Sequence, residues 1–74
     1  MTWEKKDSLI KEFKFDDFMQ ALAFVNKVGA LAENANHHPD IFLSWGKVKI
    51  SLKTHSENKI TEKDYALAKD IDAL

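Results

Sequence analysis

The chain has 74 residues and no cysteine, so it forms at most one domain, and neither disulfides nor a thiolate metal site can stabilise it. A formal net charge of -1 gives no basic field for phosphate backbones, which argues against direct nucleic-acid binding. No apolar run approaches the roughly 20 residues that span a bilayer, and the first residues lack the pattern of a signal peptide. We therefore expect a cytoplasmic protein with no membrane contact, stabilised by dense packing and self-association.

Two short strands are expected at the start of the chain. The segments "TWEKK" and "SLIKEFKF" lie on either side of a polar stretch around Asp7, a pattern typical of a hairpin. Leu9, Phe13 and Phe15 share parity, so we expect them on one face of the second strand.

An amphipathic helix is expected next, capped by Asp16 or Asp17 and running to about Asn34. Its apolar residues recur at spacings of three and four, which predicts a buried stripe of Phe18, Ala21, Leu22, Val25, Val28 and Ala32. Pro39 disfavours helical backbone at His38, so the following histidine pair should lie in an exit loop with extended backbone.

A second hairpin is predicted from "IFLSW" and "KVKISLKTH", with Gly46 at the turn because glycine accepts positive φ without steric cost. Alternation along the second strand places Val48, Ile50 and Leu52 on a buried face. The opposite face, which carries Lys47, Lys49, Ser51 and Lys53, should stay open, and His55 should end the strand on that side.

A closing helix is expected after Thr61, which forms a capping-box pattern with Asp64. Its buried stripe should consist of Leu67, Ala68, Ile71 and Leu74. The order strand, strand, helix, strand, strand, helix predicts an α+β fold, a four-stranded antiparallel sheet with helices packed on one face. The uncovered face and the free edges favour pairing with a second copy, edge to edge or through the helices.

Three histidines are the candidates for chemistry, and His37, His38 and His55 flank the second hairpin. They could be exposed surface residues, metal ligands or proton carriers. Zinc is disfavoured because adjacent histidines direct their side chains apart, and no HxH, HxxxH or cysteine spacing is present. The chain also lacks a nucleophile elbow and a glycine-rich phosphate loop, so we expect no metal and no cofactor.

Proton transfer is the remaining class of chemistry, because imidazoles give and take protons near neutral pH. Dehydrations, tautomerisations and isomerisations need only such transfers. Asp64 or Glu33 could orient an imidazole or a substrate amine. Each acid also has a plain structural interpretation, since Asp64 stands where it can cap a helix and Glu33 lies at a helix end.

The spacing of Glu33, His37-His38-Pro39, Trp45, His55 and Asp64 resembles the signature of the pterin-4a-carbinolamine dehydratases. The resemblance extends over nearly the whole chain, through Trp3, "FKFDDFMQALAFVNKV", "KVKISLKTH" and "ITEKDYALAKDID". It implies an antiparallel sheet with helices on one side and a homodimer or homotetramer. It also implies dehydration of 4a-hydroxytetrahydropterin to the quinonoid dihydropterin, a step that recycles the cofactor of aromatic amino acid hydroxylases.

The resemblance further implies roles for individual residues. His37 and His55 would form the acid/base pair, His38 would position the pterin, and Asp64 would orient His55 or join the hydrogen-bond network. The positions that would line the substrate pocket are Glu33, Asn36 and Thr54.

This sequence also departs from the family pattern. Asn36 replaces an acid that often precedes the histidine pair, and Ile41 stands where an aromatic is frequent. The chain starts almost at the strand of Trp3, so we expect residues 1–74 to form one domain without the family's usual N-terminal helical segment.

Two other functions stay open. Some members of this family act as dimerisation cofactors for a homeodomain transcription factor, so this chain could bind a partner helix through its own helical face. It could instead act on a related pterin, for example in molybdopterin metabolism. The three histidines, which a pure binding module would not need, favour the enzyme.

Overall fold

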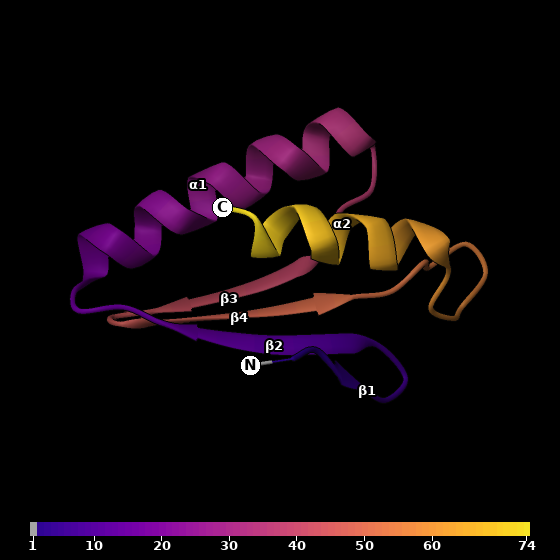
Figure 1. Ribbon diagram of the computed structural model, residues 1–74, viewed down its shortest axis with the longest axis horizontal. Coiled ribbons are helices and arrows are strands. Elements are labelled where there is room, and N and C mark those ends of the chain that lie inside the picture. The colour runs from indigo at the N-terminus through magenta and orange to yellow at the C-terminus, as the bar shows by residue number, and fades with distance from the viewer. Residues whose placement is uncertain (1) are drawn as a thin grey trace.

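The computed structural model describes residues 2–74 as two strand pairs, each followed by a helix (Figure 1). The elements are β1 (Glu4–Lys5), β2 (Leu9–Lys14), α1 (Phe18–Ala35), β3 (Asp40–Ser44), β4 (Lys47–Leu52) and α2 (Glu62–Asp72). This order confirms the predicted one.

The four strands form one antiparallel sheet in the order β1-β2-β4-β3. β2 pairs with β4 over its whole length, from Leu9 opposite Leu52 to Lys14 opposite Lys47. The two central strands are therefore far apart in sequence, and the pairing brings the start of β2 beside the end of β4. β3 lies at one edge and the two-residue β1 at the other.

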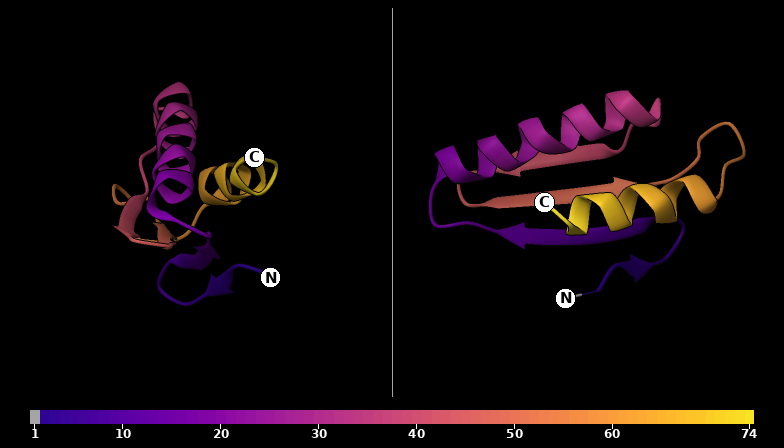
Figure 2. Two further views of the ribbon diagram at one scale, coloured as in Figure 1. Left: turned by 90° about the vertical axis from the view of Figure 1, so that its left-hand side faces the viewer. Right: turned by 45° about the horizontal axis from the view of Figure 1, so that its top comes forward.

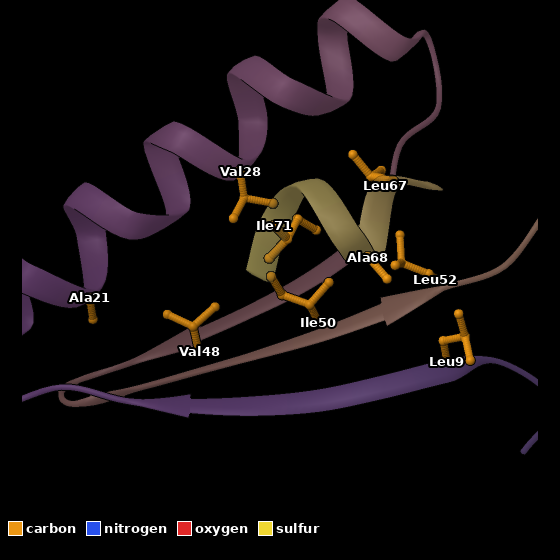
Figure 3. Packing of buried hydrophobic residues seen from close by; sticks show 9 residues of the cluster. All are labelled: Leu9, Ala21, Val28, Val48, Ile50, Leu52, Leu67, Ala68 and Ile71. Carbon is orange, nitrogen blue, oxygen red and sulfur yellow. The ribbon is translucent and has the colours of Figure 1, made fainter. Parts of the chain in front are cut away.

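Both helices cover the same face of the sheet, as the end-on view in Figure 2 shows. The core lies between these layers, where β4 contributes three fully buried side chains, Val48, Ile50 and Leu52. Val28 of α1 and Leu67, Ala68 and Ile71 of α2 pack onto them (Figure 3). The alternation predicted for β4 is confirmed, and the fold is the expected α+β arrangement.

The ends of α1 follow local capping chemistry. The Asp17 carboxylate accepts a hydrogen bond from the backbone N–H of Gln20 at 2.8 Å, which identifies it as the N-cap. The helix ends at Ala35, one residue beyond the predicted end. Asn36 follows with φ 50° and ψ 42°, the left-handed conformation in which asparagine is tolerated better than most residues.

Several details of the prediction were wrong. Phe18 and Leu74 were expected in the buried stripes, but they are 42% and 48% exposed, because Phe18 is the first residue of α1 and Leu74 lies two residues beyond the end of α2. The first strand is reduced to Glu4–Lys5. β4 ends at Leu52, so His55 lies in a turn after the strand and not on the open side of the sheet.

Gly46 is required at the β3–β4 turn, but not for the expected reason. None of the glycines has positive φ. A Cβ atom at Gly46 would lie 2.8 Å from the carbonyl oxygen of Phe15. The Phe15 N–H donates to the Gly46 carbonyl at 2.8 Å, so close approach of two backbones excludes a side chain here.

Lys11 is a charged residue on the inner face of β2, where the alternation of the strand would suggest an apolar side chain. It shares the inner face with Leu9 and Phe13, and its side chain is only 12% exposed. Its Nζ donates to Asp72 at 2.7 Å and lies 5.0 Å from the centroid of the Phe13 ring. The same carboxylate accepts from the Trp3 indole at 3.0 Å, which ties the N-terminal segment to the end of α2.

Within residues 2–74, neither helix has the length and apolar character needed to cross a membrane.

Candidate functional site

The candidate site lies where two connections between elements meet at one end of the sheet. The end of α1 leads into β3, the end of β4 leads into a turn, and that turn leads into the start of α2 (Figure 1). The antiparallel pairing of β3 with β4 puts the start of one strand beside the end of the other. The side chains of His37, Thr54, Thr61 and Asp64 therefore come into contact.

The central contact joins His37 to Asp64. Nε2 of His37 lies 2.6 Å from Oδ1 of Asp64, 27 residues away in the sequence. Asp64 is fully buried, and the His37 side chain is 12% exposed. A hydrogen bond this short and shielded from water holds the imidazole ring in one orientation.

Asp64 is held from its other side by two further donors. Its Oδ2 accepts from the Thr54 hydroxyl at 2.8 Å and from the Thr61 backbone N–H at 2.9 Å. The second bond completes the predicted capping box at the start of α2. One carboxylate therefore caps a helix and orients a histidine, so the two interpretations of Asp64 are both satisfied.

These contacts determine the charge on Asp64. Burial alone would raise its pKa, but hydrogen bonds from His37, the Thr61 backbone and the Thr54 hydroxyl outweigh burial and lower the pKa below its ordinary value. Its position in the first turn of α2 also favours negative charge. Asp64 is therefore ionised at neutral pH and acts only as a hydrogen-bond acceptor.

The ionised carboxylate fixes the tautomer of neutral His37. Nε2 must carry the proton that it donates to Asp64, which leaves the lone pair on Nδ1. Among the described residues, no buried side-chain nitrogen or oxygen lacks a hydrogen-bond partner, and the ring's only such bond is through Nε2. Nδ1 is therefore open to solvent, where it can accept a proton from a bound molecule.

His38 has a different partner, as expected for adjacent histidines. Its Nε2 lies 2.6 Å from Oε1 of Glu33, and both side chains are largely exposed. Glu33 belongs to the last turns of α1, and the left-handed Asn36 turns the chain between the two residues. Asn36 is itself exposed, so its backbone conformation is its evident structural contribution.

His55 and Thr54 are neighbours with opposite environments. Thr54 is 3% exposed and its hydroxyl is already bonded to Asp64 and Thr61, so it supports the site from behind. His55 is exposed in the turn of residues 55–58, and its ring has no hydrogen bond with the described residues. Asp64 was expected to orient His55 or to join the hydrogen-bond network of the site, and its carboxylate bonds to His37, Thr54 and Thr61.

The histidines do not gather as metal ligands within residues 2–74, where no group of three or more His, Asp or Glu side chains could hold an ion. A hollow of about 560 Å³ lies elsewhere, between β2 and the end of α2. A shallower one of about 520 Å³ borders the start of α2, where Thr61 contributes to its wall.

Sequence reasoning did not identify Thr61 as part of the site. Its hydroxyl lies 2.6 Å from that of Thr54, a contact that depends on the path of the intervening turn. The signal for Thr54 was available, because Thr54 continues the parity of the buried residues of β4 and should point inward. No pattern in the sequence indicated which of the three histidines Asp64 would face.

Known proteins resemble this chain over most of its length. Residues 1–74 match the sequence profile of the family described as pterin 4 alpha carbinolamine dehydratase. A protein of Alkaliphilus metalliredigens with the provisional name pterin-4-alpha-carbinolamine dehydratase is 50% identical over 64 residues, which are 86% of this chain and 58% of that protein. A relative in Rubrobacter xylanophilus with the same provisional name is 46% identical, over 97% of this chain and 69% of that protein.

Solved structures agree with the sequence matches. A protein of Brucella melitensis described as a transcriptional coactivator/pterin dehydratase superposes with a TM-score of 0.87 at 34% identity, over 99% of this chain and 78% of that one. A pterin dehydratase-like protein described as a RuBisCO assembly factor of the alpha-carboxysome gives a TM-score of 0.81 at 30% identity, over 99% of this chain and 88% of that one. This chain therefore belongs to the pterin-4a-carbinolamine dehydratase family.

Proposed function

We propose that this protein dehydrates a 4a-hydroxytetrahydropterin to the quinonoid dihydropterin by histidine acid/base catalysis. The observation that carries the proposal is the 2.6 Å contact between His37 and the buried, ionised Asp64. Membership of the dehydratase family supports a pterin as the substrate.

The reaction needs two proton transfers and no redox step. The hydroxyl group on C4a receives a proton and leaves as water, taking the electron pair of the C4a–O bond. The N5–H bond breaks, and its electron pair forms the C4a=N5 double bond. One group must therefore donate a proton to oxygen while another accepts the proton from nitrogen.

His37 suits the role of base in this scheme. Its Nε2–H is held by Asp64, so the lone pair on Nδ1 faces outward, and the carboxylate stabilises the imidazolium that forms. His55, whose ring is exposed and unpaired among the described residues, would donate the proton to the leaving hydroxyl. His38 and Glu33, joined at 2.6 Å, would bind the polar edge of the pterin with Asn36.

A stopped-flow assay tests this proposal. The substrate is generated in place by an aromatic amino acid hydroxylase, and its dehydration is followed with and without the purified protein at neutral pH. His37→Ala and His55→Ala should each lower the rate by about 10²–10⁴-fold, the usual range for loss of an acid or base. Glu57→Ala, an exposed change in the same turn as His55, is the matched control and should leave the rate unchanged. Folded histidine variants that keep the parent rate would refute the proposal.

A protein-binding role is the second candidate. Two solved relatives carry such descriptions, a transcriptional coactivator and a RuBisCO assembly factor. This chain also exposes large apolar side chains, among them Met19 at 71%, Trp45 at 68% and Phe42 at 57%. Binding of a partner helix should survive His37→Ala and His55→Ala, whereas catalysis should not, so the same variants separate the two functions.

Assembly and pathway belong to the same proposal. The unpaired outer edge of β3 and the exposed apolar side chains favour a homodimer or homotetramer in the cytoplasm, which sedimentation would measure directly.

Recycling of tetrahydrobiopterin is the pathway we propose, with a related pterin such as one of molybdopterin metabolism as the alternative. Rates with pterins that differ in their side chains would distinguish these substrates.

A further inference from the structure

A pair of threonine hydroxyls, those of Thr54 and Thr61, lies behind Asp64 at the two ends of the segment that carries His55. Oγ1 of Thr54 lies 2.6 Å from Oγ1 of Thr61 and 2.8 Å from Oδ2 of Asp64. The contact between the threonines closes the segment of residues 54–61, which contains the His55 turn. Asp64 then connects this closed segment to His37.

The turn itself is held by backbone bonds that start at Thr54. Its N–H donates to the Lys59 carbonyl at 3.0 Å, and the Lys59 N–H donates back at 3.3 Å. The His55 carbonyl accepts from the N–H of Asn58, which adopts a positive φ of 53°. The hydroxyl contact adds a side-chain bond across the open end of this turn.

The direction of each hydrogen bond between Thr61, Thr54 and Asp64 follows from which groups can only accept. The ionised Asp64 can only accept, so the single hydroxyl proton of Thr54 points to Oδ2. The Thr54 oxygen must then accept from Thr61, whose own oxygen accepts from the backbone N–H of Lys63 at 3.3 Å. The hydroxyl of Thr61 is thus the first hydroxyl donor in the series of hydrogen bonds that connects it, through Thr54 and Asp64, to the His37 ring.

We propose that Thr61 is a positioning residue whose hydroxyl, acting through Thr54 and Asp64, holds the His37 ring and the His55 turn in one geometry. Helix capping alone does not account for this arrangement, because an N-cap needs only an acceptor, whereas the contact with Thr54 requires a donated proton. The kinetic part of this inference rests on the function proposed above, but its structural part does not.

The choice of variants separates capping from positioning. Thr61→Gly removes the hydroxyl, yet glycine is an acceptable N-cap residue. Thr61→Ser keeps both the cap and the proton donor. Ser51→Ala is the matched control, because it removes a part-buried hydroxyl pair of the same kind, Ser8 with Ser51 at 2.9 Å, away from the histidines.

The first measurement is NMR of the protein with ¹⁵N-labelled histidine and without any pterin. In the parent and in Ser51→Ala, the Nε2–H of His37 should give a downfield resonance that exchanges slowly with water, because the bond to Asp64 is short and shielded. The resonance should persist in Thr61→Ser. In Thr61→Gly it should exchange at least about tenfold faster, because the carboxylate loses part of its fixed support. An unchanged resonance in folded Thr61→Gly would overturn the proposal.

A second observation on the parent needs no variant. The Thr54 hydroxyl proton, held between a buried oxygen and the Asp64 carboxylate, should exchange slowly enough to be detected. Fast exchange of this proton would contradict the proposed hydrogen bonds from Thr61 to Thr54 and from Thr54 to Asp64, whether or not Thr61→Gly folds.

Kinetics provide the functional test. In the dehydration assay, Thr61→Gly should lower kcat by about 3–10-fold with little change in KM, since small losses of alignment act on the chemical step. Thr61→Ser and Ser51→Ala should stay within about twofold of the parent. If the parent dehydrates and Thr61→Gly keeps the full kcat, positioning by Thr61 is refuted while the proposed function stands. If the parent does not dehydrate, the proposed function fails and the NMR result alone decides the role of Thr61.

Discussion

Replacing the Asp64 carboxylate by an amide tests the proposed mechanism most directly. Asp64→Asn preserves the size of the side chain but leaves a single acceptor oxygen in place of two. The parent carboxylate accepts from three donors, Nε2 of His37, the Thr54 hydroxyl and the Thr61 backbone N–H. The amide can satisfy only one side of this arrangement as an acceptor.

The amide should turn its oxygen toward the two threonine donors. The opposite orientation would direct its NH₂ group at a buried hydroxyl and a backbone N–H, and each unsatisfied donor there would cost about 1–3 kcal/mol. In the preferred orientation the NH₂ group faces His37, so Nε2 must become the acceptor. The ring then carries its proton on Nδ1, the atom that is proposed to act as the base.

The expected loss of rate is about 10²–10⁴-fold, because the base is held in the wrong tautomer. The same substitution in a serine-protease triad lowers kcat by about 10⁴ for this reason. Stability should fall by only about 1–2 kcal/mol, since all three contacts keep a hydrogen bond, one of them reversed, and lose only the charge of the carboxylate. At 1.36 kcal/mol for each factor of ten, the barrier rises by about 3–5 kcal/mol.

Stopped-flow rates and histidine ¹⁵N shifts are the two measurements required. Asp72→Asn is the matched control, because Asp72 also accepts from two donors but lies at the far end of α2, away from the histidines. It should keep the parent rate. Adding Asp64→Asn to His37→Ala should lower the rate little further, because the two residues act as one catalytic pair that either change alone disables. A folded Asp64→Asn protein whose rate is within about threefold of the parent would refute the mechanism.

Further predictions concern stability. The lowered pKa of Asp64 means that its ionised form stabilises the fold above the unfolded value near 3.9, and that this contribution is lost as pH falls through the lower folded value. Urea midpoints of the parent and Asp64→Asn should therefore differ at pH 7 and converge in strong acid, and a gap that persists there would contradict this account. Gly46→Ala should destabilise by about 1–3 kcal/mol because its Cβ meets the Phe15 carbonyl at 2.8 Å. Gly29→Ala, with no heavy atom within 4 Å, should stabilise the middle of α1 by about 0.5–1 kcal/mol, and denaturant titration of both variants checks the contrast. Ile50→Ala, at a fully buried position, should cost about 2–5 kcal/mol, and loss of the cooperative transition is the expected calorimetric result.

Local patterns in the sequence determined most of the secondary structure. The alternation of Val48, Ile50 and Leu52 predicted the buried face of β4, and all three are fully buried. The pair Thr61 and Asp64 predicted the start of α2, and the capping box is present. These predictions held because strand parity and helix capping depend on residues only two to four positions apart.

Long-range geometry decided what local patterns could not. Phe18 and Leu74 fit helical periodicity, but Phe18 begins α1 and Leu74 lies beyond the end of α2, and both side chains are exposed. Gly46 was recognised as a turn residue, yet its requirement comes from the Phe15 carbonyl, which is distant in sequence. Lys11 occupies an inward position because Asp72 of α2 neutralises its charge there.

The candidate site shows the same contrast between local pattern and long-range geometry. By itself, the sequence determined the α+β class and, through the spacing from Glu33 to Asp64, the family, because these depend on which residues are present and how far apart they stand. Only the tertiary structure decided that Asp64 faces His37, that Thr54 and Thr61 stand behind it, and that His55 is exposed in its turn. Hydrogen bonds are directional and act within about 3 Å, so such partners are known only when the chain path brings their atoms together.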